Sequence, residues 1–314
     1  MLPVVFWRME DYPRTLMELE RRFSDEASCR DYLIALRWPN GPTCPRCGKR
    51  KGVVVRRALW RCSACRHEVS VTAGTVFQDS KLPLTVWFRA MWQMTSQKNG
   101  ISALGVKRVL GLGNYKTAWI MLHKLRRAMI RPGRERLQGV VEIDETYYGG
   151  EEKGMRGRQI EKKALIAVAA EAVPGSASAI GRIRLAHIPD ATRETLHGFI
   201  SQSVEPGSTV ITDGLPTYCS LKDYVHQRQI RKQQIEDEAL LPRVHRVASL
   251  LKRWLLGTHQ GAVEHEYLDD YLNEFTFRFN RRTSKSRGKL FYRLAQQAVS
   301  VPPTPRNILV KHNQ

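Results

Sequence analysis

Long apolar runs are missing from this 314-residue chain, and acidic residues are scarce relative to basic ones. No apolar run approaches the roughly 18 residues that a transmembrane helix needs, so we expect no membrane role. Asp and Glu number 30 against 51 for Lys and Arg, which gives a formal net charge of +21. A surface of this charge attracts polyanions, and nucleic acid is therefore the expected partner. The hydrophobic share of 42% is that of a folded protein with two or three cores.

The chain also lacks a positively charged leader followed by a long apolar stretch, because acidic residues are frequent between Glu10 and Glu20. We therefore expect a cytoplasmic, reducing environment. Only six cysteines are present, and in such a compartment they are poor candidates for disulfides. Cys29 and Cys219 have no partner at metal-ligand spacing and are expected to be small buried residues.

The other four cysteines form two CxxC pairs, Cys44 with Cys47 and Cys62 with Cys65, separated by 14 residues. Two such turns can direct four thiolates at one tetrahedral zinc ion. Zinc would be structural, because four thiolates leave no open coordination position for water. His67 could replace a cysteine but is expected to be a bystander. Basic residues around the pairs suggest contact with DNA, while docking of a protein is the alternative.

Helical periodicity dominates the segment that follows. Apolar residues from Leu84 to Trp92 recur at the spacing of one helix face. A short helix at 102–110, a glycine turn and a third helix capped by Asn114 are then expected, which is a helix-turn-helix pattern. Lys116 and Arg127 on the third helix are candidate DNA contacts, although an ordinary basic, solvated helix is the alternative.

A second domain begins where the periodicity changes to that of strands. Apolar runs predict strands at 140–148, 164–170 and 180–187, then a helix capped by Asp190 and a strand at 209–212. This order predicts an α+β or mixed α/β fold. The segment 278–293 is basic without an acidic residue and should lie against phosphates or in solvent. Its candidate DNA contacts are Arg281, Arg282, Lys285 and Arg287.

Two aspartates stand within or at the end of apolar strands. Asp144 lies in the run VVEIDETYY, where a carboxylate is costly unless it is paired or bound to metal. Asp213 ends the strand at 209–212, although Asp-Gly is also a common turn. Side by side, the two could bridge hard cations for phosphodiester chemistry. Glu142 and Glu145 flank Asp144, and only Glu142 shares its strand face.

At these residues the sequence resembles the insertion-sequence fifteen-ninety-five transposases, over about residues 25 to 295. The resemblance lies in EIDETYYGG (142–150), TDG (212–214), HRVASLLKRWLLGTHQGAV (245–263) and YLNEFTFRFNRR (271–282), behind TAGTVFQDSKLPLTVWF (72–88) and the cysteine pairs. It implies a ribonuclease H-like catalytic core with an acidic triad and Mg²⁺ or Mn²⁺.

In that resemblance Asp144 and Asp213 match the first two catalytic aspartates, the third ligand falls at His245, and Lys252 matches a lysine seven residues later. At this third position the sequence has a histidine instead of the glutamate of an Asp, Asp, Glu pattern, and magnesium prefers oxygen to a ring nitrogen. His245 and Lys252 share one face of an expected helix, opposite an apolar stripe from Val247 to Leu255. Substitute ligands are available just before that helix, namely Glu236, Asp237 and Glu238.

The expected organisation has five parts. They are an N-terminal helical segment (1–40), a zinc ribbon (41–75), a helical DNA-binding segment (76–135), the catalytic domain (136–295) and a tail (296–314). The expected function is that of a bacterial DNA transposase, which cuts transposon ends and joins them to target DNA as a homo-oligomer on double-stranded DNA. The alternatives are an inactive, transposase-derived DNA-binding regulator and a nuclease that does not join strands.

Overall fold

The chain folds into two compact units in this computed structural model, which describes residues 10–56, 59–131, 133–149, 163–176, 178–230 and 240–310. The first unit combines residues 1–131 with residues 283–314, and the second consists of residues 132–282. The second unit is therefore inserted into the sequence of the first. Within the described residues, no helix combines the length and the apolar character that a membrane span would need.

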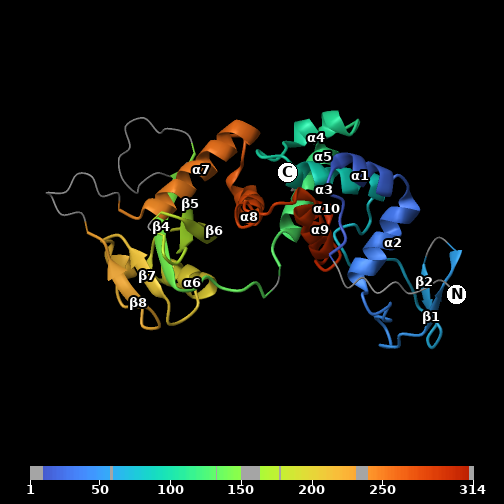
Figure 1. The fold of residues 1–314 in the computed structure, drawn as a ribbon, viewed down its shortest axis with the longest axis horizontal. Helices are drawn as coiled ribbons and strands as arrows, with labels where there is room; N and C mark the ends of the chain where they lie inside the picture. Colours follow the sequence, from blue (N-terminus) through green and yellow to red (C-terminus); the bar gives the residue numbers. More distant parts are fainter. Residues whose placement is uncertain are drawn as a thin grey trace. The chain divides into compact units, whose positions relative to one another are not determined.

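The first unit is mainly helical and contains a small sheet (Figure 1). Its helices are α1 (Leu16–Arg22), α2 (Glu26–Arg37), α3 (Leu84–Ser96), α4 (Ala103–Val109), α5 (Tyr115–Ala128), α9 (Arg287–Ala298) and α10 (Arg306–Leu309). Aromatic rings of α2, α3 and α9 share one core, in which Phe88 lies 5.9 Å from Tyr32 and 5.6 Å from Phe291 between ring centroids. Burial of such rings is the main stabilising contribution here.

Residues 278–293 were expected to form a basic tail, with the catalytic domain extending to residue 295. The structure instead has helix α9 in this region, and it belongs to the first unit. Its apolar face, with Leu290, Phe291 and Leu294, is buried against α3 and α2 of the first unit. Gly288 approaches the backbone so closely that a Cβ atom there would lie 1.7 Å from the Pro13 carbonyl oxygen. The many basic residues of this segment obscure its amphipathic pattern, and the apolar face of such a helix needs a packing partner.

The second unit is built on a five-stranded sheet. Its strands are β4 (Val140–Tyr148), β5 (Ala164–Ala172), β6 (Ile180–Ile188), β7 (Thr209–Thr212) and β8 (Val225–Arg228), in the order β6-β5-β4-β7-β8. The pairs β4–β5 and β5–β6 are antiparallel, whereas β7 runs parallel to β4 and β8 parallel to β7. This order and these directions are those of the ribonuclease H-like fold that the resemblance implies.

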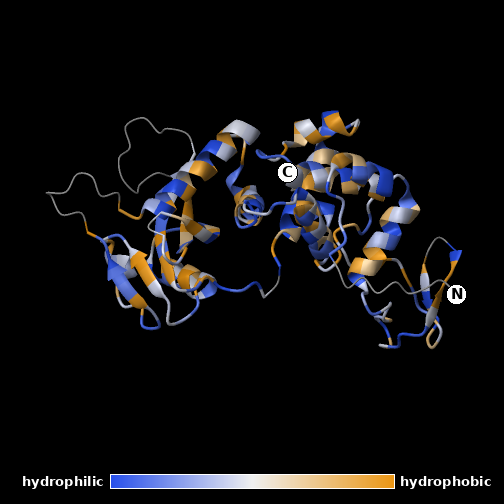
Figure 2. Ribbon diagram, viewed as in Figure 1, coloured by the Kyte–Doolittle hydropathy of each residue, from blue (hydrophilic) through white to orange (hydrophobic). Residues whose placement is uncertain are grey.

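Helices cover both faces of this sheet. Helix α6 (Arg193–Ser203) packs on one face, and α7 (Pro242–His259) and α8 (Leu268–Phe279) pack on the other. Side chains of β5 alternate between the two cores, because Ile166 and Val168 face α7 whereas Leu165 and Ala167 face the α6 side. Figure 2 shows the matching alternation of hydrophobic and hydrophilic residues along α7.

Several local predictions are confirmed and others need correction. Strands β4 to β7 and the cap of α5 lie where the sequence places them, and Asn114 accepts a hydrogen bond from the Lys116 amide at 2.7 Å. The cap of α6 is Thr192 rather than Asp190, whose carboxylate instead accepts from the Thr192 amide and hydroxyl. Strand β8 was not predicted, because its exposed residues lack an apolar pattern.

Candidate functional site

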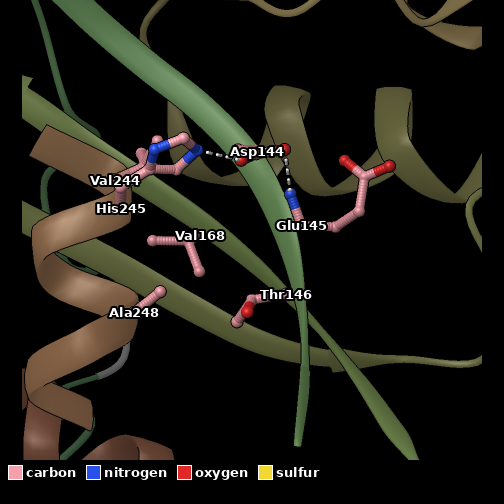
Figure 3. A pocket seen from close by; sticks show the side chains of 7 residues that line it. All are labelled: Asp144, Glu145, Thr146, Val168, Val244, His245 and Ala248. Atoms are coloured by element: carbon pink, nitrogen blue, oxygen red, sulfur yellow. Dashed lines mark hydrogen bonds and ion pairs between the residues drawn. The ribbon is translucent and has the colours of Figure 1, made fainter. Parts of the chain in front are cut away.

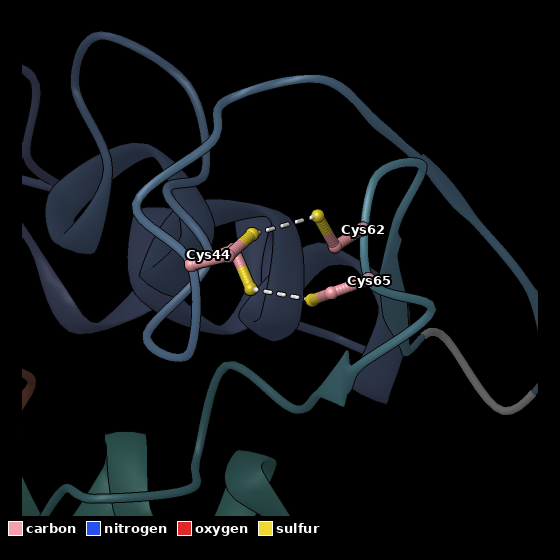
Figure 4. Close-up of side chains that lie close together, drawn as sticks. Cys44, Cys62 and Cys65 are labelled. Carbon is pink, nitrogen blue, oxygen red and sulfur yellow. Dashed lines mark hydrogen bonds between the residues drawn. The ribbon is translucent and has the colours of Figure 1, made fainter.

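The four paired cysteines lie together in the first unit. Strands β1 (Gly52–Val54), β2 (Trp60–Cys62) and β3 (Glu68–Val69) form an antiparallel sheet beside them. The Sγ atoms of Cys44 and Cys65 are 3.5 Å apart, as are those of Cys47 and Cys62, and all four ligand atoms lie within 4.8 Å of one another (Figure 4). Thiolates around one zinc at ~2.3 Å would be about 3.8 Å apart, so this set fits a tetrahedral ion.

Each cysteine pair closes a tight turn that ends in a left-handed residue. The Gly48 amide donates to the Cys44 carbonyl, and the Arg66 amide donates to the Cys62 carbonyl. Gly48 has φ +70° and Arg66 has φ +60°, so the second turn puts a residue with a side chain where glycine is favoured. Hydrogen bonding from the Cys65 backbone lowers the pKa of the Cys62 thiol to about 7, which favours the thiolate that binds metal. The side chain of His67 does not belong to this cluster.

Asp144 and Asp213 lie at adjacent positions of two parallel strands. The β4–β7 register pairs Glu142 with Ile211, so two residues further along Asp213 follows β7 beside Asp144. Burial raises the pKa of Asp144 above its ordinary value, and the charge of Asp213 raises it further. Asp213 also accepts a hydrogen bond from the Leu215 amide at 3.0 Å, which fixes its turn. Two carboxylates held this close repel each other unless a proton or a cation lies between them.

His245, in the first turn of α7, completes this cluster. Its Nε2 atom lies 3.2 Å from an Asp144 carboxylate oxygen, and 58% of its side chain is exposed. Both residues line a hollow of about 140 Å³ together with Thr146, Val168 and Ala248 (Figure 3). The structure thus brings His245 of α7 to Asp144 of β4. Residues Glu236, Asp237 and Glu238 lie outside the described residues.

Lys252 lies two helical turns after His245 and is half-buried. Burial lowers its pKa, and the charge of Lys163 lowers it further. The apolar side of α7 carries Val247, Leu251, Trp254 and Leu255, all buried as the periodicity predicts. Lys252 is thus kept out of the core by the same periodicity that places His245 beside Asp144.

Two domain models of one family match this chain. Residues 136–280 match the ISXO2-like transposase domain, and residues 24–68 match the transposase zinc-ribbon domain. The matches contain Asp144, Asp213, His245 and all four paired cysteines. The chain belongs to the insertion-sequence fifteen-ninety-five family of transposases.

One relative and one solved structure extend this comparison. A Halobacterium salinarum protein described as "Uncharacterized protein in transposable element ISH50" is 28% identical over an alignment of 293 positions, which covers 82% of this chain and 92% of that protein. A chain of the simian T-cell lymphotropic virus intasome in complex with PP2A regulatory subunit B56 gamma is 18% identical, with a TM-score of 0.31. The similarity covers 62% of this chain and 69% of that chain, and a TM-score this low does not indicate a shared fold.

Helices α4 and α5, for which the sequence predicts a helix-turn-helix, differ in part from expectation. Ala118, Leu122, Leu125 and Met129 of the third helix region are buried, and Lys116 is exposed. His123 and Arg126 of the same helix are buried. Arg127 is half-buried. Because Lys116 is exposed and Arg126 is buried, a basic side chain alone does not identify the outer face of α5.

The candidate DNA contacts near residue 280 divide into two groups. Arg281 donates to the Phe277 carbonyl, and Arg282 donates to the carbonyls of Gly181 and Ile180. The Arg281 bond braces the C-terminal end of α8, and the Arg282 bonds join that end to the start of β6. Lys285 and Arg287 are exposed.

Cys219, expected to be buried, is only half-buried, whereas Cys29 is fully buried.

Sequence reasoning missed two polar contacts around the aspartates. Glu142 is buried and forms an ion pair with Arg243 at 2.6 Å. On the other face of β4, Glu145 accepts a 2.6 Å hydrogen bond from the buried Tyr218 hydroxyl. Burial, together with the charge of Glu145, raises the pKa of Tyr218. The sequence carries one usable signal, since α7 starts at Pro242 without a Ser, Thr, Asp or Asn cap and must find an acceptor elsewhere.

Proposed function

We propose that this transposase cleaves DNA at transposon ends and transfers the cut strand into target DNA. The observation that carries the proposal is the pair Asp144 and Asp213 on adjacent parallel strands, with His245 against Asp144. Family membership supports a transposase-type function, and this cluster supplies the chemistry that such a function requires.

The donor set fits a divalent cation through its carboxylates. Asp144 and Asp213 offer hard oxygen ligands for Mg²⁺, and the half-buried position of Asp144 makes the paired charges costly without one. When bound, such cations polarise a phosphodiester and stabilise its attacking and leaving oxygens. His245 offers a nitrogen, which suits Mn²⁺ better than Mg²⁺. Lys252 would contact a DNA phosphate near the cut.

DNA binding is proposed to involve the ribbon and the helix-turn-helix of the first unit. A net charge of +21 supports a polyanionic partner, and structural zinc at the four cysteines would keep the ribbon folded. Lys116, Arg127, Lys285 and Arg287 are proposed phosphate contacts. Arg281 and Arg282 would contact phosphates as well, while Arg281 also braces α8 and Arg282 also holds α8 to β6. Joining two ends in one complex requires more than one copy, so we propose a homo-oligomer on DNA.

Replacement of either aspartate tests the proposal. Asp144→Asn and Asp213→Asn should each lower cleavage and joining of a pre-cut DNA end by at least about a hundredfold, because one lost carboxylate leaves the cations under-coordinated. Binding of the end should stay unchanged, since the basic surfaces are intact. Asp223→Asn is the matched control, because Asp223 is exposed and precedes β8 at the opposite end of the parallel strands.

The results also separate the rival functions. Metal-dependent cleavage without joining would indicate a nuclease, and end binding without either reaction in the native protein would indicate a regulator. Wild-type joining by both Asn variants would refute the assigned site.

A further inference from the structure

Helix α7 begins without a local cap. The residue before it, Leu241, has φ +49° and offers no side-chain acceptor, and the first helical residue is Pro242, which has no N–H. The next amides, of Arg243 and Val244, therefore need acceptors from elsewhere in the structure.

Glu142 supplies that acceptor from strand β4. One carboxylate oxygen accepts from the Arg243 amide at 2.7 Å and from the Val244 amide at 3.2 Å. The other oxygen accepts from the Arg243 guanidinium at 2.6 Å. Only 3% of the Glu142 side chain is exposed, so these bonds form away from water, where an unpaired charge would be strongly unfavourable.

Arg243 extends the connection to a third element. Its guanidinium also donates to the carbonyls of Ser176 and Ala179, in the connection between β5 and β6. A single ion pair thus joins strand β4, the β5–β6 connection and the start of α7. Residues about a hundred positions apart in the sequence meet there.

The same strand and helix carry the proposed catalytic contact. Glu142 and Asp144 are two residues apart on one face of β4, and Arg243 and His245 are two residues apart in the first turn of α7. The pair Glu142–Arg243 therefore lies beside the pair Asp144–His245. We propose that Glu142 is a positioning residue, which fixes the first turn of α7 and thereby holds His245 beside Asp144. The effect of Glu142 on metal affinity rests on the function proposed above.

Apolar packing alone would not fix this position. Val247, Leu251 and Leu255 pack α7 on the sheet through contacts that are not directional. Hydrogen bonds from two successive amides to one carboxylate define where the helix starts and how it is rotated. Groups that orient metal ligands from outside typically change metal affinity by about 10- to 100-fold when they are removed.

The chain offers a matched control in its other unit. Glu26 caps α3 in the same way, since its carboxylate accepts from the Leu84 and Thr85 amides at 2.9 Å. Helix α3 also begins at a proline, with Pro83 as the residue before its first turn, and it has no local side-chain cap. Glu26→Ala should reduce stability as Glu142→Ala does, but it should leave the aspartate site unaffected.

Two measurements on the zinc-loaded full chain test the proposal. The first is the ¹³C NMR signal of the His245 ring, recorded in buffer to which neither Mg²⁺ nor Mn²⁺ is added. The signal is assigned by its loss in His245→Asn. The second is Mn²⁺ affinity by electron paramagnetic resonance. Glu142→Ala should shift the His245 signal and weaken Mn²⁺ binding by at least about tenfold, and Glu142→Gln should do both to a smaller extent.

The two proposals fail in different ways. An unshifted His245 signal in Glu142→Ala, or in Glu142→Gln if the Ala variant does not fold, would overturn the positioning role. An equal shift in Glu26→Ala would overturn it too, since general destabilisation would then explain the effect. Mn²⁺ affinity that is unchanged in Asp144→Asn would refute the proposed metal site, while the His245 signal would still report on Glu142.

Discussion

Individual carboxylates in this chain have separate tasks that their neighbours determine. Asp144 and Asp213 lie side by side and are available to a cation, whereas Glu142 is occupied by Arg243 and the start of α7. Glu145, adjacent to Asp144 in sequence, faces the opposite side of β4 and accepts from Tyr218. Strand alternation therefore separates Glu145 from Asp144, and the neighbour Arg243 separates the task of Glu142 from that of Asp144.

His245 is the residue at which the proposed site departs from an all-carboxylate set. His245→Glu should keep or raise Mg²⁺-dependent strand transfer, because a carboxylate offers oxygen to a hard cation. His245→Ala should reduce it only in part, since water can replace one weak ligand. Both are measured by joining of pre-cut ends in Mg²⁺ and in Mn²⁺. Wild-type activity of His245→Ala, with an inactive Glu238→Gln, would show that His245 is not the third ligand.

Gly288 permits the close approach of α9 to the Pro13 backbone. Gly288→Ala should lower the free energy of unfolding of the first unit by about 1–3 kcal/mol, because the added methyl group displaces packed backbone. Thermal unfolding measures the effect. Gly198→Ala in α6 is the control, since no atom lies within 4 Å of its added Cβ and alanine favours the helix. Equal stability of the two variants would contradict the close contact.

Some residues of the site could be predicted from the sequence and others could not. Asp144 and Asp213 stand out because carboxylates are unusual in apolar strands, and the cysteines because of their spacing. The role of Arg243 was not predictable, since its partner Glu142 is a hundred residues away and only the folded sheet brings them together. Thr192 and Asp190 are both good cap residues, so the sequence could not choose between them.

The zinc ribbon has only a small apolar core of its own. Its core holds Cys44, Trp60, Cys62 and Val69, and two of these four are metal ligands. Secondary structure was most predictable for long periodic elements such as α3 and α7. It was least predictable for α9, whose charge obscured its apolar face, and for the short exposed β8.

Removal of zinc should therefore affect this element first. A chelator should raise hydrogen exchange in residues 41–75 before it affects the sheet of the second unit, because structural zinc contributes directly to folding. Cys62→Ser should lower the zinc content below one ion per chain, whereas Cys219→Ser should leave it unchanged. Purified protein that contains no zinc, or uniform exchange after chelation, would contradict this prediction.

The molecule as a whole carries a large positive charge, but not every basic residue is available to DNA. Lys289 and Arg293 form ion pairs with Glu10, whereas Lys285 and Arg287 are exposed. Lys285→Ala with Arg287→Ala should reduce the slope of log affinity against log salt by about 1.8, because two fewer counterions are released. Lys289→Ala with Arg293→Ala removes the same charge and should change the slope less. An unchanged slope in the first variant would place both residues away from DNA.

The insertion of residues 132–282 into the first unit imposes an order on its synthesis. A ribosome makes the ribbon and helices α1 to α5 first, then the entire second unit, and only afterwards α9, whose Phe291 joins the aromatic core. At about 5–20 residues per second the intervening chain takes roughly 10 to 30 s to emerge. During this interval the nascent first unit exposes the surface that α9 later covers. A chain released early would lack α9 and would leave the first unit unfinished, so only molecules that already carry both aspartates can complete it.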